Sequence, residues 1–184
     1  LAADQESVCE LLRMLGDLTA TEICDRMRFE AERLSAENNT QLEVVGEWLG
    51  QLLAARRIVE VTLNGESRFI LAQNCARYRD ALQIAVPTDL PHAFLEPTVD
   101  AIEDLFMQFA RTHMPFSASE IAKHWGVEDR LIEAKLESLV AENRLLKGEF
   151  RPACQGIEWC APQVLAVLKR RSLAKARRQI EPVE

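Results

Sequence analysis

The sequence predicts a mainly α fold with small β wings, an α+β arrangement in which two winged-helix domains follow one another. Three observations lead to this prediction. A short helix-turn-helix signature occurs twice, helical patterns stand before and after each copy, and an Asn64-Gly65 pair separates two strand-like runs. The repeat carries the most weight, because a repeated supersecondary unit decides the architecture of the whole chain.

The repeated signature is the hexapeptide LTATEI at residues 18–23, which is matched by FSASEI at residues 116–121. The offset between corresponding positions falls from 98 residues at the signature to 87 at the end of the unit, where Arg57 corresponds to Arg144. The first copy therefore has about eleven additional residues, which we place in a loop at 29–40. Helical patterns precede the signatures at residues 7–15 and 99–111 and follow them at residues 41–56 and 128–143.

Each signature also contains the start of a helix. Thr19 and Ser117 are suited to cap a helix N-terminus, and a glutamate stands three residues after each of them, where it completes a capping box. These glutamates are Glu22 and Glu120. The third helix of each copy has apolar residues at the spacing of one buried face. They are Leu49, Leu52 and Leu53 in the first copy, and Ile132, Leu136, Leu139 and Val140 in the second.

Strands are expected after both third helices. Residues 58–63 and 67–71 flank Asn64-Gly65, a pair typical of a type I′ hairpin turn, because both central residues of that turn need a positive φ. Three helices followed by a hairpin form a winged helix, although two unrelated helical bundles remain the alternative. The strands expected for the second wing are less regular and cover residues 144–147 and 157–160.

Prolines mark the junction between the two domains. Pro87, Pro91 and Pro97 interrupt a stretch that cannot form one continuous helix, so we expect a linker at residues 86–98. Pro162 suits the first turn of a last helix. The expected domains are residues 1–85, a winged helix with a trailing helix at 74–84, and residues 99–184, a winged helix with a basic C-terminal helix from Pro162 to about Ile180.

The composition is that of an ordinary folded protein, with 48% hydrophobic and 28% charged residues. The chain begins with Leu1, from which we expect it to be a segment of a longer protein. It contains no secretion signal and no apolar run near the roughly 20 residues that cross a bilayer, so we expect a cytoplasmic location and no membrane partner. The five cysteines are scattered, and we interpret them as reduced and buried; zinc is disfavoured because only Cys154 and Cys160 stand close together.

Motifs for catalysis are missing from the sequence. It has no Gly-rich phosphate loop, no Gly-x-Ser-x-Gly elbow and no His-Glu-x-x-His motif. Its carboxylates stand at the spacing of helix surfaces, and none of the three histidines has a sequence neighbour that suggests general-base catalysis. We therefore expect no enzyme activity, no catalytic residue, no metal, no cofactor and no small-molecule substrate for this segment.

The charge is distributed unevenly along the chain. The net charge is −7, but residues 161–184 contribute +4 and the rest therefore carries −11. The last helix of a helix-turn-helix normally enters the DNA major groove, and here both third helices are acidic. Such faces repel phosphates, so sequence-specific operator binding by the repeated units is not expected. The acidic residues are Glu43 and Glu47 in the first copy, and Glu128, Asp129, Glu133 and Glu137 in the second.

The last helix has the opposite character. At about 100° per residue, one side carries apolar residues and the other carries arginines. The apolar residues are Leu165, Leu168, Leu173, Ala176 and Ile180, and the arginines are Arg170, Arg171, Arg177 and Arg178. A basic face can follow a phosphate backbone, or it can be a solvated face that pairs with a neighbouring domain. The nucleic-acid-binding residues that we predict are Lys169, Arg170, Arg171, Lys175, Arg177 and Arg178.

Several short motifs resemble the C-terminal extension of the large helicase-related (Lhr) proteins, which are bacterial superfamily-2 ATP-dependent helicases that move 3′ to 5′ along single-stranded DNA. The resemblance covers residues 77–183 and is weaker over residues 1–76; Met114 stands where glycine is expected. It implies that ATP and Mg²⁺ belong to RecA-like domains whose motifs do not occur here. The motifs are RYRDAL at 77–82, FLEP at 94–97, ARTH at 110–113, GEFRP at 148–152, EWC at 158–160, RRSLA at 170–174 and IEPV at 180–183.

The resemblance and the basic helix together predict a non-catalytic accessory module, for DNA binding or scaffolding, of a 3′–5′ DNA repair helicase. Its expected partners are single-stranded or forked DNA and neighbouring domains of the same chain. Two alternatives remain open. The family's extension is similar to a bacterial interstrand-crosslink DNA glycosylase, which implies a part in base excision, and a pure protein-interaction module is the other. A transcriptional repressor is disfavoured by the acidic third helices.

Overall fold

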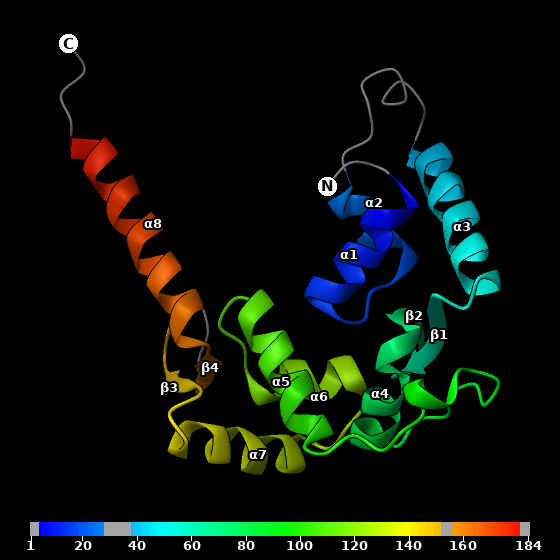
Figure 1. Cartoon of the computed structure of the whole chain (residues 1–184). Coiled ribbons are helices and arrows are strands. Elements are labelled where there is room, and N and C mark those ends of the chain that lie inside the picture. Colours follow the sequence, from blue (N-terminus) through cyan, green and yellow to red (C-terminus); the bar gives the residue numbers. More distant parts are fainter. Residues whose placement is uncertain (1–3, 28–37, 152–155, 181–184) are drawn as a thin grey trace. The chain divides into compact units, whose positions relative to one another are not determined.

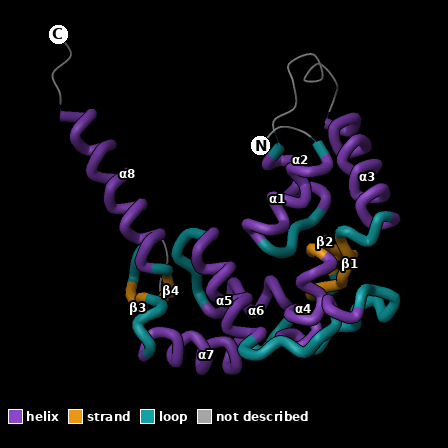
Figure 2. Tube along the Cα trace, in the orientation of Figure 1, coloured by secondary structure: helices purple, strands orange, loops and turns teal. Residues whose placement is uncertain are grey.

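The computed structural model describes residues 4–27, 38–151 and 156–180, and Figure 1 shows their helices and strands. The chain divides into two compact units. Unit 1 comprises Leu1–Gln108 and His124–Gly126, and unit 2 comprises Phe109–Lys123 and Val127–Glu184. Most of the described residues are helical, and the strands form two small antiparallel pairs, which are orange in Figure 2. The predicted fold class, mainly α with small β wings, is confirmed.

Unit 1 begins with three helices whose ends are determined by local sequence. Asp4 caps the first helix by accepting a hydrogen bond from the Ser7 backbone N–H at 2.7 Å. The predicted capping box of the second helix is confirmed, with Glu22 N–H donating to Thr19 Oγ1 at 3.1 Å and Thr19 N–H donating to Glu22 Oε2 at 3.0 Å. The additional residues expected at 29–40 lie largely outside the described residues. The helices are α1 (Gln5–Leu15), α2 (Ala20–Arg26) and α3 (Asn38–Ala54).

The predicted first wing is also confirmed. Strands β1 (Ile58–Leu63) and β2 (Glu66–Leu71) pair in antiparallel register with Leu63 opposite Glu66. Asn64 and Gly65 connect them with φ of 50° and 78°, as a type I′ turn requires. After β2 the chain continues through η1 (Ala72–Asn74), α4 (Cys75–Leu82), which corresponds to the predicted trailing helix, and η2 (His92–Phe94).

The core of unit 1 forms where the helices pack on the wing. Leu49 and Leu52 of α3 are buried as the periodicity predicted, and Leu53 is partly buried. The turn between α1 and α2 joins the wing as well, because Leu18 and Phe69 exchange two backbone hydrogen bonds, of 3.2 and 2.8 Å. The turn is thereby held against β2. The other buried core residues include Val8, Leu12, Ile23, Val45 and Ile58.

The second half of the chain has the same order of elements. Phe116 and Trp159 exchange two backbone hydrogen bonds, of 3.0 and 2.8 Å, as Leu18 and Phe69 do in unit 1. The predicted capping box at Ser117 and Glu120 is confirmed by reciprocal hydrogen bonds of 2.6 and 3.2 Å. The elements are α5 (Ala101–Thr112), α6 (Ala118–Trp125), α7 (Asp129–Ala141), β3 (Leu146–Gly148), β4 (Glu158–Cys160) and α8 (Pro162–Ile180).

The boundary between the compact units differs from the proline-rich linker expected at 86–98. Most of α5 belongs to unit 1 together with the end of α6, and the remainder of both helices belongs to unit 2. This division into compact units does not test the domain bounds inferred from the sequence, which stay a prediction. Among the described helices, none combines the length and the apolar character that crossing a membrane requires.

Candidate nucleic-acid interface

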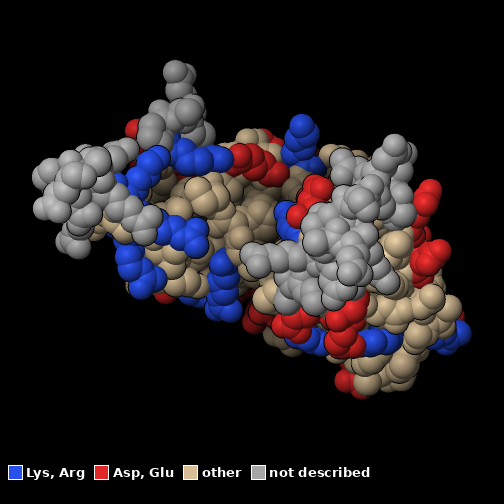
Figure 3. Space-filling view, turned by 90° about the horizontal axis from the view of Figure 1, so that it is seen from above, with Lys and Arg blue, Asp and Glu red and all other residues tan. Residues whose placement is uncertain are grey.

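Helix α8 presents the basic residues that the sequence singled out. It begins at Pro162, directly after β4, and the N–H groups of Val164 and Leu165 donate to the buried Ala161 carbonyl at 3.0 and 3.1 Å. Lys and Arg side chains gather on the left of Figure 3, over α8. The side chains of Lys169, Arg170, Arg171 and Lys175 are exposed, whereas those of Arg177 and Arg178 lie outside the described part of the structure.

These four cations lack the acidic neighbours that several other basic residues have. In the part of the chain that the structure describes, none of the four forms an ion pair. By contrast, Arg57 lies 2.7 Å from Glu6 in unit 1, and Lys147 lies 2.6 Å from Glu137 in unit 2. The positive charge of α8 is therefore not neutralised locally, and it can attract an anion.

Among its described side chains, the apolar side of α8 is covered near the start of the helix and exposed at Leu173. Val164, Leu165 and Leu168 are partly buried, whereas Leu173 is 61% exposed. The expectation that Arg171 lies on the side opposite Leu168 is wrong, because both side chains line one cavity. The physical reason is helical geometry, since residues three positions apart differ by only about 60° around the axis.

The acidic character of both third helices persists in the folded chain. Glu43 and Glu47 on α3 are exposed, and so are Glu133 and Glu137 on α7. Among the described residues, Glu137 forms an ion pair with the amine of Lys147, and the other three glutamates form none. A DNA backbone approaching either helix in the usual helix-turn-helix manner meets negative charge.

Unit 1 has a buried polar cluster centred on Asp17 that sequence reasoning missed. Asp17 Oδ2 lies 3.0 Å from Arg68 Nη1 and 2.8 Å from His124 Nε2. Asp17 Oδ1 accepts hydrogen bonds from Tyr78 Oη at 3.1 Å and Trp125 Nε1 at 3.3 Å. Burial by itself raises the pKa of Asp17, but the hydrogen bond from His124 and the charge of Arg68 outweigh it and lower the pKa. No sequence pattern indicates this cluster, because the hydrogen-bonding partners stand 51 to 108 residues from Asp17.

Unit 2 has a second cluster, in which Arg151 joins two glutamates. Arg151 Nη2 lies 2.8 Å from Glu120 Oε2, and its Nε contacts the fully buried Glu158. Glu158 Oε2 also accepts the backbone N–H groups of Phe150 and Arg151, both at 2.8 Å. The hydrogen bonds from Arg151 lower the pKa of Glu120 to about 2. In Glu158, burial raises the pKa and the Arg151 hydrogen bond lowers it, with a net lowering. The cluster therefore joins Arg151, in the segment that follows β3, to Glu158 of β4 and to Glu120 at the start of α6.

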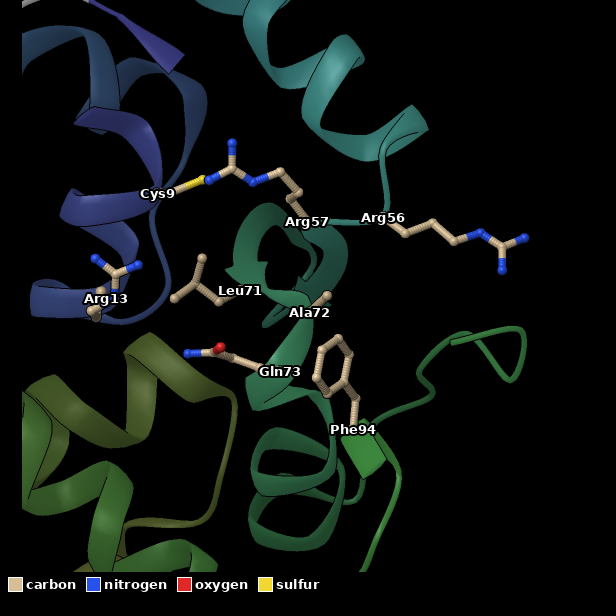
Figure 4. Close-up of a pocket in the computed structure, with 8 residues that line it drawn as sticks. All are labelled: Cys9, Arg13, Arg56, Arg57, Leu71, Ala72, Gln73 and Phe94. Atoms are coloured by element: carbon tan, nitrogen blue, oxygen red, sulfur yellow. The ribbon is translucent and has the colours of Figure 1, made fainter. Parts of the chain in front are cut away.

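A cavity of about 240 Å³ in unit 1 also contains arginines, and Figure 4 shows its lining. Arg57 reaches toward Cys9 in this view, and Arg56 points away from the other labelled side chains. Each arginine here has an acidic partner: Arg13 pairs with Glu10, Arg56 with Asp89 and Arg57 with Glu6. The positive charge at this cavity is therefore already compensated, whereas that of the four described cations of α8 is not.

The cysteines make no cluster suited to a metal within the described residues. Cys9, Cys75 and Cys160 are buried free thiols, and Cys24 is half-buried. Burial raises the pKa of the Cys75 thiol to about 11, which keeps it protonated at neutral pH. Cys154, the other cysteine considered for zinc, lies outside the described residues.

Comparison with known proteins gives one family and two relatives. The model of the winged-helix domain of the large helicase-related protein matches residues 1–97. A Mycolicibacterium smegmatis protein, described as an Lhr helicase and probable uracil glycosylase, is 37% identical over 182 residues, which are 99% of this chain. An Escherichia coli Lhr helicase/uracil glycosylase is 28% identical over the same length. The chain spans only 11% of each relative. The matches include the first half, where the motif resemblance was weaker.

Proposed function

The chain belongs to the winged-helix family of the large helicase-related proteins, and from this premise we propose that it is a non-catalytic accessory module that helps an ATP-dependent 3′–5′ DNA repair helicase hold DNA. In this proposal the ATP and Mg²⁺ chemistry resides in other domains of the longer protein, in the cytoplasm. The two units, which share one order of elements, act as a tandem scaffold for α8 and for neighbouring domains of the same chain.

The observation that carries the proposal is the uncompensated positive charge of α8 in an otherwise acidic chain. Lys169, Arg170, Arg171 and Lys175 are exposed and form no ion pair with described residues. Each phosphate contact that such a side chain makes releases counterions from the nucleic acid, so binding weakens with salt. The acidic α3 and α7 favour contact through α8 over contact through the third helices.

Single-stranded DNA is the preferred partner in this proposal, with forked DNA as the second form to test. If the four described cations each contact one phosphate of a single strand, the logarithm of the binding constant falls with the logarithm of the salt concentration with a slope of roughly −3. Fluorescence anisotropy of a labelled oligonucleotide between about 50 and 200 mM salt measures this slope.

A matched pair of variants separates the role of α8 from the effect of net charge. The α8 variant is K169Q/R170Q/K175Q, and the control is R13Q/R26Q/R130Q, which removes the same charge from exposed residues elsewhere. We expect the α8 variant to weaken binding and flatten the salt slope, and the control to change binding much less. Equal losses in both variants, or no salt-dependent binding by the unmodified chain, would refute DNA binding by α8 and leave scaffolding alone.

The second candidate function is a part in base excision, because the names of both relatives include uracil glycosylase. A glycosylase needs a carboxylate beside a flipped base in a fitted pocket. The buried carboxylates of Asp17 and Glu158 are each engaged by several protein donors, which speaks against their direct use. Incubation of the chain with uracil-containing single-stranded DNA tests this candidate: abasic product supports it, and intact DNA removes it for this segment.

A further inference from the structure

A groove in unit 2 combines an apolar floor with two uncompensated arginines. It has a volume of about 300 Å³ and lies between the end of α5 and the first half of α8. Val164, Val167 and Leu168 of α8 contribute apolar side chains, and Met114 also lines the groove. Met114 is 58% exposed, although it is a large apolar residue. A volume near the lower end of the range for ligand sites fits one small planar group rather than a long segment.

One wall of the groove is a fixed aromatic ring. The His113 ring stacks on the buried Phe109 ring, with centroids 3.7 Å apart and planes 6° from parallel. His113 Nδ1 also lies 2.9 Å from the Phe109 carbonyl oxygen and 3.0 Å from Thr112 Oγ1. Stacking and hydrogen bonding together hold the ring in one orientation, so the wall is already ordered without a ligand.

The charges around the groove select an anionic ligand. Arg111 and Arg171 both line it, both are exposed, and neither forms an ion pair with any residue that the structure describes. Lys175 stands four residues after Arg171 and therefore continues the same side of α8. A bare phosphate would make no contact with the apolar floor, whereas an uncharged apolar group would not pair with the arginines. A nucleotide, which has a flat base attached to phosphates, satisfies both parts.

We propose that this groove holds one unstacked base of a single-stranded DNA segment, with Arg111 and Arg171 bound to the adjacent phosphates. The proposal rests on the DNA-binding function proposed for α8 and adds a base contact to it. The base lies over Met114 and Leu168 beside His113, and the strand continues along α8 toward Lys175. Single-stranded binding proteins commonly combine base stacking with a basic track in this way, without reading sequence.

The test compares two strands that differ only in their bases. One is an oligothymidine of about 12 nucleotides, and the other has the same backbone with abasic residues throughout. Because base contacts of this kind add to phosphate contacts, we expect the chain to bind the oligothymidine roughly five- to tenfold more tightly than the abasic strand at low salt. Anisotropy titrations with the two labelled strands give this ratio directly.

The variant M114S tests the groove itself. L173S is its control, because Leu173 of α8 is about as exposed as Met114 but does not line the groove. M114S should lower the preference for the oligothymidine at least about twofold, and L173S should leave it unchanged. R111Q should weaken binding of the oligothymidine and reduce its salt dependence. Thermal unfolding of each variant verifies that the fold is retained.

The outcomes separate the groove from the wider proposal. Equal affinity for both strands overturns the base site while DNA binding by α8 stands. Binding of neither strand overturns both. Groove-dependent binding of a peptide of alternating glutamate and leucine, with no preference between the strands, assigns the groove to an acidic protein segment and overturns the nucleotide. A base preference that M114S lowers and L173S retains supports the proposal.

Discussion

The carboxylate of Asp17 and the guanidinium of Arg68 form an ion pair that is shielded from water on both sides. Their atoms lie 3.0 Å apart, and the two side chains are only 5% and 7% exposed. Arg68 is further held by Glu66 at 2.7 Å and by Glu22, the capping-box residue of α2, at 3.2 Å. The pair therefore connects the turn before α2 with strand β2, where the helix-turn-helix meets its wing.

Replacing Asp17 by asparagine should destabilise unit 1 strongly. The acidic partners that remain for the buried Arg68, Glu22 and Glu66, are partly exposed to solvent. Removing one partner of a buried ion pair costs roughly 3–5 kcal/mol of unfolding free energy. Urea denaturation followed by circular dichroism measures this loss. The control is D25N at an exposed aspartate of α2, where a change of no more than about 0.5 kcal/mol is expected. Similar stabilities for the two variants would show that the pair contributes little.

The Glu120–Arg151 contact predicts a specific loss of stability in acid. The pKa of Glu120 is lowered from 4.5 to about 2 in the folded chain, so its ionised form stabilises the fold. This contribution is fully present above pH 4.5 and disappears as the pH falls through about 2. Because the Glu120 side chain is 47% exposed, solvent screening reduces its size.

Unfolding free energies of the wild type and E120Q between neutral pH and about pH 2.5, by which most of the contribution is lost, measure it. Glutamine retains the capping-box hydrogen bond but does not titrate. E120Q should therefore lose less stability than the wild type on acidification, whereas E133Q, at an exposed glutamate of α7, should behave as the wild type does. Parallel pH curves for the wild type and E120Q would contradict the role assigned to Arg151.

Two glycines with positive φ should respond differently to alanine. Gly65 has φ of 78° and open space around its Cα, so G65A should cost about 1 kcal/mol from backbone strain alone. Gly16 has φ of 94°, and a Cβ there would stand 2.9 Å from Tyr78 Oη, the hydroxyl that donates to Asp17. G16A should therefore lower the melting temperature more than G65A does. A smaller effect at Gly16 would mean that Tyr78 moves without disturbing the cluster.

The capping boxes predict parallel effects in the two copies of the signature. T19A and S117A each remove the side-chain oxygen that accepts a backbone N–H at the start of a short helix. Each should cost about 1 kcal/mol of unfolding free energy. T21A, at an exposed position inside α2, provides the matched control and should be neutral or slightly stabilising, since alanine has the higher helix propensity. Chemical denaturation of the three variants makes the comparison.

The features that the sequence predicted correctly arise from interactions between residues close together in the chain. Thr19 and Glu22 complete a capping box across three residues, Asn64-Gly65 closes a hairpin between adjacent strands, and Pro162 begins α8. Such signals depend on backbone conformation and short-range hydrogen bonds, which any chain with these residues reproduces. The fold class and the basic character of α8 were therefore predictable before the structure was known.

The remaining features needed the folded chain, because they bring together residues with no common local pattern. Asp17 meets Arg68, Tyr78 and Trp125 across 51, 61 and 108 residues, and the groove forms only where the end of α5 lies beside α8. A sequence shows that an aspartate or an arginine is charged, but not whether an opposite charge lies near it. Packing left the four described cations of α8 without ion pairs and gave Arg13, Arg56 and Arg57 of unit 1 acidic partners, since burial and pairing depend on distances between side chains in the folded chain.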